Sequence, residues 1–285
     1  MRFEYLQPGT MKEALALLDQ YGSDARILAG GTDLMLKMEA KVLKPKYVID
    51  ISGIAELSYI KPDGNKGLSI GALTTVSDIA KSEVIKKQFP LLAQAAGLLG
   101  SMAVRNVATL GGNICNAAPS AENAPALLCL NAKVKIVGPK GERVIPLEEF
   151  FTGPGATVLA PNEILVEFQI PAAKPNARGV YLKHSHRGSI DLSTVGVAAV
   201  ASFDGNKKCE DVKIALGAVA ATPIRAKKAE GMLKGKTLDE KTIEAAACAA
   251  AEDSSCITDV RASAEYRADM VIAYTRRALQ MVMPA

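Results

Sequence analysis

Two short Gly-Gly segments constrain this chain more than any other feature. The sequence reads AGGTDL at residues 29–34 and ATLGGN at residues 108–113, each directly after an apolar run. Paired glycines let the backbone turn sharply and approach a ligand closely, because no Cβ stands in the way. Successive N–H groups in such a loop can form a concave nest for phosphate oxygens. Two such loops in one chain therefore favour an extended ligand that carries a diphosphate, such as a dinucleotide.

Neither segment has the spacing of the better-known phosphate loops. Both the Walker A pattern and the Gly-x-Gly-x-x-Gly pattern of Rossmann folds are absent from them. Taken alone, either glycine pair is also compatible with a structural turn. Thr32, Thr109 and Asn113 add side-chain hydrogen-bonding groups beside the backbone. A carboxylate aimed at phosphate would repel it, so we expect Asp33 to cap the following helix or to hold the amides of its own loop.

Composition narrows the class of protein. The chain has 34 basic and 30 acidic residues without a dense basic block, and aromatic residues make up 5%, with no Trp. Both features argue against nucleic-acid binding. The five cysteines show no CxxC spacing, and the two histidines, His184 and His186, lie beside Lys183 and Arg187. We therefore expect no disulfide framework and no metal site in this chain. The first residues lack the apolar core of a signal peptide and no run is long enough to span a membrane, so we expect a cytoplasmic location.

Hydrophobic periodicity and turn residues predict an α+β chain. The second glycine segment is expected to be a loop, and the proline-rich residues 171–177 mark a boundary before the last third of the chain. The expected strands lie at residues 25–29, 46–50, 57–60, 67–70, 133–137, 163–170, 179–184, 195–203 and 212–219, with turns at 62–65, 138–141 and 204–206. The expected helices lie at residues 11–21, 75–81, 90–103, 227–234, 239–251 and 263–280.

Four motifs in collinear order resemble the FAD-binding subunit of the molybdenum hydroxylases. They are AGGTDL at 29–34, RNVATLGGN at 105–113 with APSAENAPALL at 118–128, YLK at 181–183 with VGVA at 195–198, and DVRASAEYR at 259–267. This family includes xanthine, carbon monoxide and nicotinate dehydrogenases and 4-hydroxybenzoyl-CoA reductase. The last carries a cysteine-rich insertion for an extra iron–sulfur cluster, which this chain lacks.

The resemblance implies a fold and three parts. It implies a two-subdomain FAD-binding fold of the vanillyl-alcohol-oxidase (PCMH) type, followed by a C-terminal α/β domain with a small antiparallel sheet backed by helices. The expected bounds are residues 1–57 for the first FAD-binding subdomain, 58–173 for the second and 174–285 for the C-terminal domain.

The resemblance also implies which residues bind FAD. One stretch would wrap the diphosphate and ribityl region, formed by Leu28, Ala29, Gly30, Gly31, Thr32, Asp33, Leu34 and Met35. The other half of the cradle would be formed by Thr109, Leu110, Gly111, Gly112 and Asn113, with backbone amides supplying most of the binding.

Four further positions match the family. Glu122 would lie near the adenosine end of FAD, and the backbone of Leu165 would contact the adenine portion. Lys183 would lie at the pyrimidine edge of the flavin, where a fixed ammonium stabilises the negative charge of the reduced ring. Leu192 would shield one face of the isoalloxazine.

As a member of this family, the chain would be the FAD-binding electron-transfer subunit of an oxidoreductase complex. Its partners would be a small [2Fe-2S] subunit and a large molybdopterin-binding subunit, assembled as a dimer of heterotrimers. The expected external electron acceptor is NAD⁺, with a quinone or ferredoxin as the alternatives. FAD would carry the redox chemistry, so no side chain is expected to be catalytic. Two alternatives stay open: a self-contained FAD oxidase of the vanillyl-alcohol-oxidase type, and a flavin-free assembly subunit.

Overall fold

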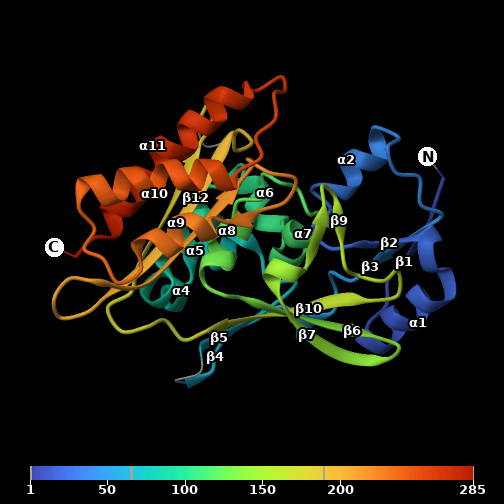
Figure 1. Ribbon diagram of the computed structural model, residues 1–285. Helices are drawn as coiled ribbons and strands as arrows, with labels where there is room; N and C mark the ends of the chain where they lie inside the picture. Colours follow the sequence, from blue (N-terminus) through green and yellow to red (C-terminus); the bar gives the residue numbers. More distant parts are fainter. Residues whose placement is uncertain (1, 65–66, 189, 285) are drawn as a thin grey trace.

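The computed structural model describes residues 2–64, 67–188 and 190–284, and it has the expected α+β architecture. Three larger sheets follow one another along the chain (Figure 1), and a two-stranded sheet, β8–β9, accompanies them. The described helices are α1 (Met11–Tyr21), α2 (Leu34–Glu39), α3 (Val76–Lys81), α4 (Glu83–Gln88), α5 (Pro90–Gly97), α6 (Met102–Val107), α7 (Leu110–Cys115), α8 (Asn123–Cys129), α9 (Lys227–Leu233), α10 (Glu240–Asp253) and α11 (Ala264–Val282).

The described strands are β1 (Glu4–Leu6), β2 (Ala25–Leu28), β3 (Tyr47–Asp50), β4 (Ile60–Pro62), β5 (Gly67–Gly71), β6 (Lys133–Gly138), β7 (Gly141–Pro146), β8 (Phe151–Gly153), β9 (Ala156–Thr157), β10 (Ile164–Pro171), β11 (Arg178–His184), β12 (Val195–Phe203), β13 (Cys209–Gly217) and β14 (Ile224–Arg225).

The first sheet is parallel, in the order β1-β3-β2. Thr10 caps α1 as expected, because its side chain accepts a hydrogen bond from the backbone N–H of Glu13 at 3.2 Å. Ala14 and Leu18 of α1 are buried against Ile49 of the central strand. Residues 29–33 leave the carboxyl end of β2, so this small, anchored sheet positions the first glycine segment.

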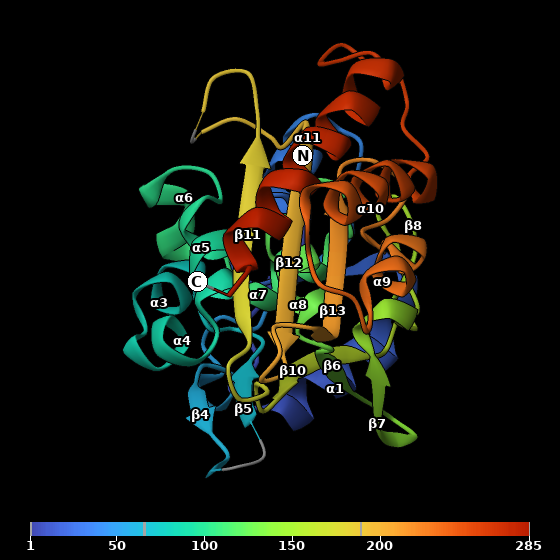
Figure 2. The same ribbon diagram turned by 60° about the vertical axis from the view of Figure 1, so that its left-hand side comes forward.

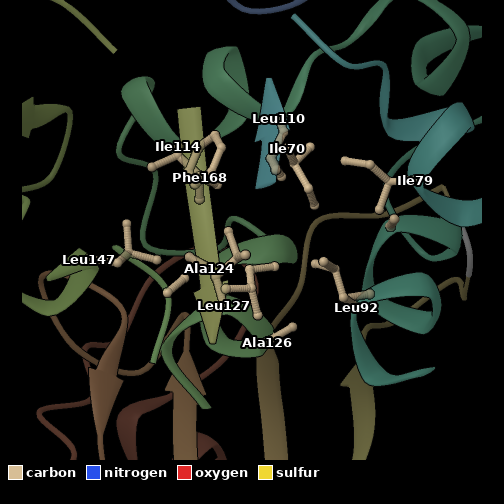
Figure 3. Packing of buried hydrophobic residues seen from close by; sticks show 14 of the residues in the cluster. Ile70, Ile79, Leu92, Leu110, Ile114, Ala124, Ala126, Leu127, Leu147 and Phe168 are labelled. Atoms are coloured by element: carbon tan, nitrogen blue, oxygen red, sulfur yellow. The ribbon is translucent and has the colours of Figure 1, made fainter. Parts of the chain in front are cut away.

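The second sheet has the order β4-β5-β10-β6-β7, and all its pairs are antiparallel. The hairpins β4–β5 and β6–β7 were expected from their turns, and residues 65–66 of the first turn lie outside the described residues. The strand expected at residues 57–60 is instead formed by Ile60–Pro62, because Ala55–Leu57 form a 3-10 helix. Helices α3, α5, α7 and α8 contribute to a common core with this sheet. Figure 3 shows Leu110 and Ile114 of α7 beside Ile70 and Phe168 of the sheet, which fixes α7 in the core.

The long helix expected over residues 90–103 is wrong. α5 ends at Gly97, Gly100 adopts a φ of +47°, and Ser101 starts the separate helix α6 by accepting a hydrogen bond from Val104 N at 3.2 Å. Arg105 of α6 stabilises the break by donating to the carbonyl of Gly100 at 2.9 Å. A glycine in the left-handed region ends a helix at little cost, and a hydroxyl cap then starts the next one.

The third sheet is antiparallel, in the order β11-β12-β13-β14, with the short β14 added to the three expected strands. Helices α9 and α11 pack on one face of this sheet, and α10 packs against these two helices. Helices α5 and α8, which also pack with the second sheet, contact the opposite face. Figure 2 shows this sandwich from the side of α9–α11. Within the described residues, no helix is both long and apolar enough to cross a membrane.

Candidate functional site

The first glycine segment, residues 29–34, presents a run of unsatisfied amides. Within the part of the chain that the structure describes, the backbone N–H groups of Gly30 through Leu34 have no hydrogen-bond acceptor. Gly31 adopts a φ of +71°, a conformation that favours glycine and that turns successive N–H groups toward one side. Most of the segment is only partly exposed to solvent. An anion with several oxygens, such as a diphosphate, satisfies such a run of donors.

Gly30 brings the two glycine segments together. A Cβ built on Gly30 would lie 2.1 Å from the carbonyl oxygen of Val107 and 2.9 Å from the Cα of Ala108. Residue 30 must therefore lack a side chain for the first segment to lie against the residues that lead into the second. This long-range contact joins a loop of the first sheet to the helical layer of the second.

The second glycine segment is not the open loop that was expected. Thr109 is the N-cap of α7, and its hydroxyl accepts from Gly112 N at 3.0 Å. Leu110 N donates to Thr74 O at 3.0 Å, Gly111 N donates to Ala72 O at 2.8 Å, and Asn113 N donates to Thr109 O at 3.0 Å. These amides are already bonded within the protein, so a contribution of this segment to a phosphate cradle stays a prediction.

Gly111 is required for packing rather than for ligand space. A Cβ at this buried position would lie 2.8 Å from both the Cβ and the carbonyl oxygen of Ala72. Of the second segment, the exposed Gly112 and the side chain of the half-buried Asn113 remain available to a ligand.

Asn123 orients the side chain of Asn113. Its Nδ2 donates to Asn113 Oδ1 at 3.1 Å, and Asn123 itself is fully buried at the start of α8. This bond occupies the carbonyl of Asn113 and leaves its NH₂ group to donate elsewhere. Asn123 Oδ1 is buried without a partner among the described residues. No local pattern singled out Asn123, because its role depends on a contact between two helices.

Asp33 and Lys37 flank the start of α2. Asp33 occupies the N-cap position but its side chain forms no capping hydrogen bond, so the expected cap is not made. Partial burial raises the pKa of its carboxyl, and the nearby Lys37 and a hydrogen bond from the Asn116 side chain act in the opposite direction. Lys37 Nζ donates to Asn116 Oδ1 at 2.5 Å, across to the end of α7. Lys37 and Asn116 lie outside the glycine motifs, and no local pattern points to either residue.

Lys183 and Glu122 form a buried ion pair between β11 and the start of α8. Lys183 Nζ lies 2.9 Å from Glu122 Oε1 and 3.1 Å from the carbonyl oxygen of Leu98. The side chains are only 3% and 7% exposed. Burial raises the pKa of Glu122, and Lys183 opposes that shift. Because the two charges touch, a place for Glu122 at the adenosine end and for Lys183 at the flavin end do not fit one extended FAD together, and the contact of each residue with FAD stays a prediction.

The two remaining candidate residues have opposite environments. Leu165 is 4% exposed, and it lies in β10 with its backbone paired to Ile136 in the middle of the second sheet. Its side chain is part of the core, and nothing in this environment supports an adenine contact specifically. Leu192 is 49% exposed on the loop between β11 and β12, where its N–H donates to the Asp191 carboxylate at 3.1 Å. An exposed leucine held on such a loop is free to cover a ligand.

Both histidines are engaged within the C-terminal part of the chain. His184 contacts the hydroxyls of Tyr274 at 3.2 Å and Tyr266 at 2.9 Å, and His186 is bonded to the carbonyl of Arg261. Burial is the main cause that lowers the pKa of His184, which favours its neutral form. These partners do not suit a covalent attachment point for a flavin.

Comparison with known proteins gives matches over nearly the whole chain. The family described as "FAD binding domain in molybdopterin dehydrogenase" matches residues 1–173, and the "CO dehydrogenase flavoprotein C-terminal domain" matches residues 180–282. The chain is 36% identical to the carbon monoxide dehydrogenase medium chain of Hydrogenophaga pseudoflava, over 98% of this chain and 96% of that one. It is 33% identical to a xanthine dehydrogenase FAD-binding subunit of Escherichia coli, over 99% and 96%.

A solved structure gives the same result in three dimensions. The carbon monoxide dehydrogenase from Hydrogenophaga pseudoflava that lacks the Mo-pyranopterin moiety superposes with a TM-score of 0.96. The match covers 99% of this chain and 97% of that chain, at 36% identity.

Proposed function

This chain belongs to the family of FAD-binding subunits of molybdenum hydroxylases, and from that premise we propose that it transfers electrons from a partner's [2Fe-2S] clusters to an external acceptor. FAD is its cofactor, and the chain is an oxidoreductase subunit. Bound FAD supplies chemistry that side chains lack, since it can take up electrons singly and release them in pairs. The protein's part is to hold that cofactor, orient it and adjust its electrostatic surroundings.

One observation carries the placement of the cofactor: the run of acceptor-free amides from Gly30 to Leu34. We place the diphosphate on these donors, with Leu28, Ala29 and Met35 completing the wrap around it. Backbone donors suit a doubly charged group because they need no cation and keep a fixed geometry. The NH₂ group of Asn113, held by Asn123, adds a donor from the second glycine segment.

Lys183 marks the flavin end in this proposal. Its ammonium has three donors, and within the described residues Glu122 and the carbonyl of Leu98 take two of them. The third is available to the pyrimidine edge of the flavin, where reduction places negative charge. We place Glu122 at the same end, because it is bonded to Lys183, and let Leu192 cover one face of the ring.

The partners follow from the family. Relatives are named as the medium chain of carbon monoxide dehydrogenases, which fits a complex with a smaller and a larger chain. We propose a small [2Fe-2S] subunit and a large molybdopterin-binding subunit, assembled as a dimer of heterotrimers in the cytoplasm. The large subunit then determines the substrate, while this chain delivers electrons to NAD⁺ in preference to a quinone or ferredoxin.

The experiment starts with the purified chain and added FAD. We expect about one flavin per folded chain, and a folded chain that retains none contradicts the proposal. The flavin-loaded chain is next mixed with the chemically reduced iron–sulfur partner, and loss of the yellow flavin absorbance reports electron arrival. NAD⁺, a quinone and oxidised ferredoxin are then added separately. Recovery of the colour with NAD⁺ supports the proposed acceptor, and recovery only with another rejects it.

A further inference from the structure

We propose that Lys37 and Asn116 form a clamp that holds the amide run of the first glycine segment in its cofactor-binding geometry. Neither residue belongs to the glycine motifs, and the two lie 79 positions apart in the chain. The inference rests on the proposed placement of the diphosphate on residues 30–34. The two residues act as positioning residues, through the backbone that they tie together.

The first glycine segment needs a second anchor. Its beginning is fixed, because Gly30 packs directly on the Val107 carbonyl. Its end runs into α2, a helix of six residues in which only Met38 is buried. Met35 and Leu36 of α2 are 46% and 63% exposed, and Figure 1 shows α2 at the periphery of the first sheet. Packing alone therefore holds the end of the segment weakly.

The Lys37–Asn116 hydrogen bond supplies that anchor. At 2.5 Å, it joins α2 directly to the end of α7, and the side chain of Asn116 also acts on the Asp33 carboxyl, whose pKa it lowers by hydrogen bonding. Asn116 is well fixed, since its own N–H donates to Gly112 O at 2.9 Å at the end of α7. A helix that is rooted in the core thus holds the helix that follows the amide run.

Charge gives Lys37 a second role. Asp33 places a carboxylate within the segment that is to receive a diphosphate, and like charges at short range repel. Lys37 lies one helical turn further on, and its charge acts on Asp33. The ammonium thus offsets the carboxylate beside the cofactor. An uncharged residue at position 37 loses both the clamp and this compensation. A change at Asn116 loses the clamp and the hydrogen bond of that side chain to Asp33, but it keeps the ammonium.

The test measures the dissociation constant of FAD for the full chain by titrating the FAD-free protein. We compare Lys37→Met, Asn116→Ala and the double variant with the natural sequence. Each single change is expected to weaken binding by about tenfold or more, because a hydrogen bond to a charged group is lost. The loss in the double variant is expected to be smaller than the product of the two single losses, since both changes break the same Lys37–Asn116 bond.

Two controls separate the clamp from general damage. Lys44→Met removes the same charge from an exposed lysine that has no hydrogen bond or ion pair among the described residues. This control variant is expected to bind FAD within about twofold of the natural chain. Lys37→Arg keeps a charged donor and is expected to restore most of the affinity. Urea denaturation of each FAD-free variant identifies any that fail to fold.

Two results would overturn the clamp. In the first, Lys37→Met and Asn116→Ala both bind FAD within about twofold of the natural chain. In the second, the affinity loss of the double variant equals the product of the losses in the two single variants. Gly31→Val separates this failure from failure of the diphosphate placement. If Gly31→Val loses FAD while the clamp variants keep it, only the clamp is wrong. If Gly31→Val keeps FAD as well, the placement on which the clamp rests is wrong.

Discussion

Replacement of Lys183 by methionine is expected to destabilise the fold strongly, because it leaves the Glu122 carboxylate buried without its counter-ion. The two charged atoms are 2.9 Å apart, and both side chains are at least nine-tenths buried. At an effective dielectric constant of about 20, their attraction is about 6 kcal/mol. Part of this gain offsets the cost of removing both charges from water, and breaking such a pair typically costs about 3–5 kcal/mol. We expect a loss in that range at about pH 8.

The loss should depend on pH through Glu122. Burial raises the pKa of this carboxyl in the folded chain, and removal of Lys183 takes away the interaction that opposes the shift. A carboxyl whose folded pKa is raised costs stability above that pKa, where it must be ionised, and the cost disappears as falling pH protonates it. The free-energy deficit of Lys183→Met should therefore shrink as the pH falls from about 8 toward about 5.

Urea denaturation of the FAD-free chain across this pH range checks the reasoning. The double variant Lys183→Met/Glu122→Gln removes the unpaired charge and is expected to be more stable than Lys183→Met at about pH 8. A deficit under about 1 kcal/mol in Lys183→Met, a deficit that does not change with pH, or a double variant that is no more stable would each refute the account of the pair.

Three further changes have expected effects, each measured by urea denaturation. Gly30→Ala forces a Cβ to within 2.1 Å of the Val107 carbonyl oxygen and should lower the free energy of unfolding by about 1–3 kcal/mol. The control Gly53→Ala, whose Cβ would have one neighbouring atom at 3.9 Å, should lower it less. Thr109→Ala removes the α7 cap and should cost about 1 kcal/mol, with Thr109→Ser close to the natural chain. Arg267→Met should cost about 3 kcal/mol or more, because its buried guanidinium donates to two carbonyls and a carboxylate.

Local sequence signals predicted the elements whose causes are local. Thr10 and Gly22 delimit α1, and the turn residues after β6 produce the β6–β7 hairpin. The three long strands and three helices of the C-terminal part also follow from periodicity. The break between α5 and α6 was missed because residues 90–103 contain few polar residues, so that periodicity does not reveal the left-handed Gly100.

The chemistry of the site depends on contacts that a local pattern cannot contain. Whether a glycine segment has free amides is decided by its neighbours: Ala72 and Thr74 accept hydrogen bonds from the second segment, and no described group accepts from the first. Likewise, the contact between Glu122 and Lys183 joins positions 61 residues apart. The motifs thus point to the two segments, and their tertiary contacts decide which backbone amides are left without an acceptor.

FAD binding by Gly31→Val and Gly235→Val tests directly whether the amide run of residues 30–34 holds the cofactor. Both glycines have a positive φ, +71° and +78°, so valine strains the backbone similarly at each. Only Gly31 lies in the amide run, and a valine there must turn the neighbouring N–H groups away from their present direction. We expect the folded Gly31→Val chain to lose FAD while Gly235→Val keeps about one flavin per chain. Natural FAD affinity in Gly31→Val would contradict this expectation.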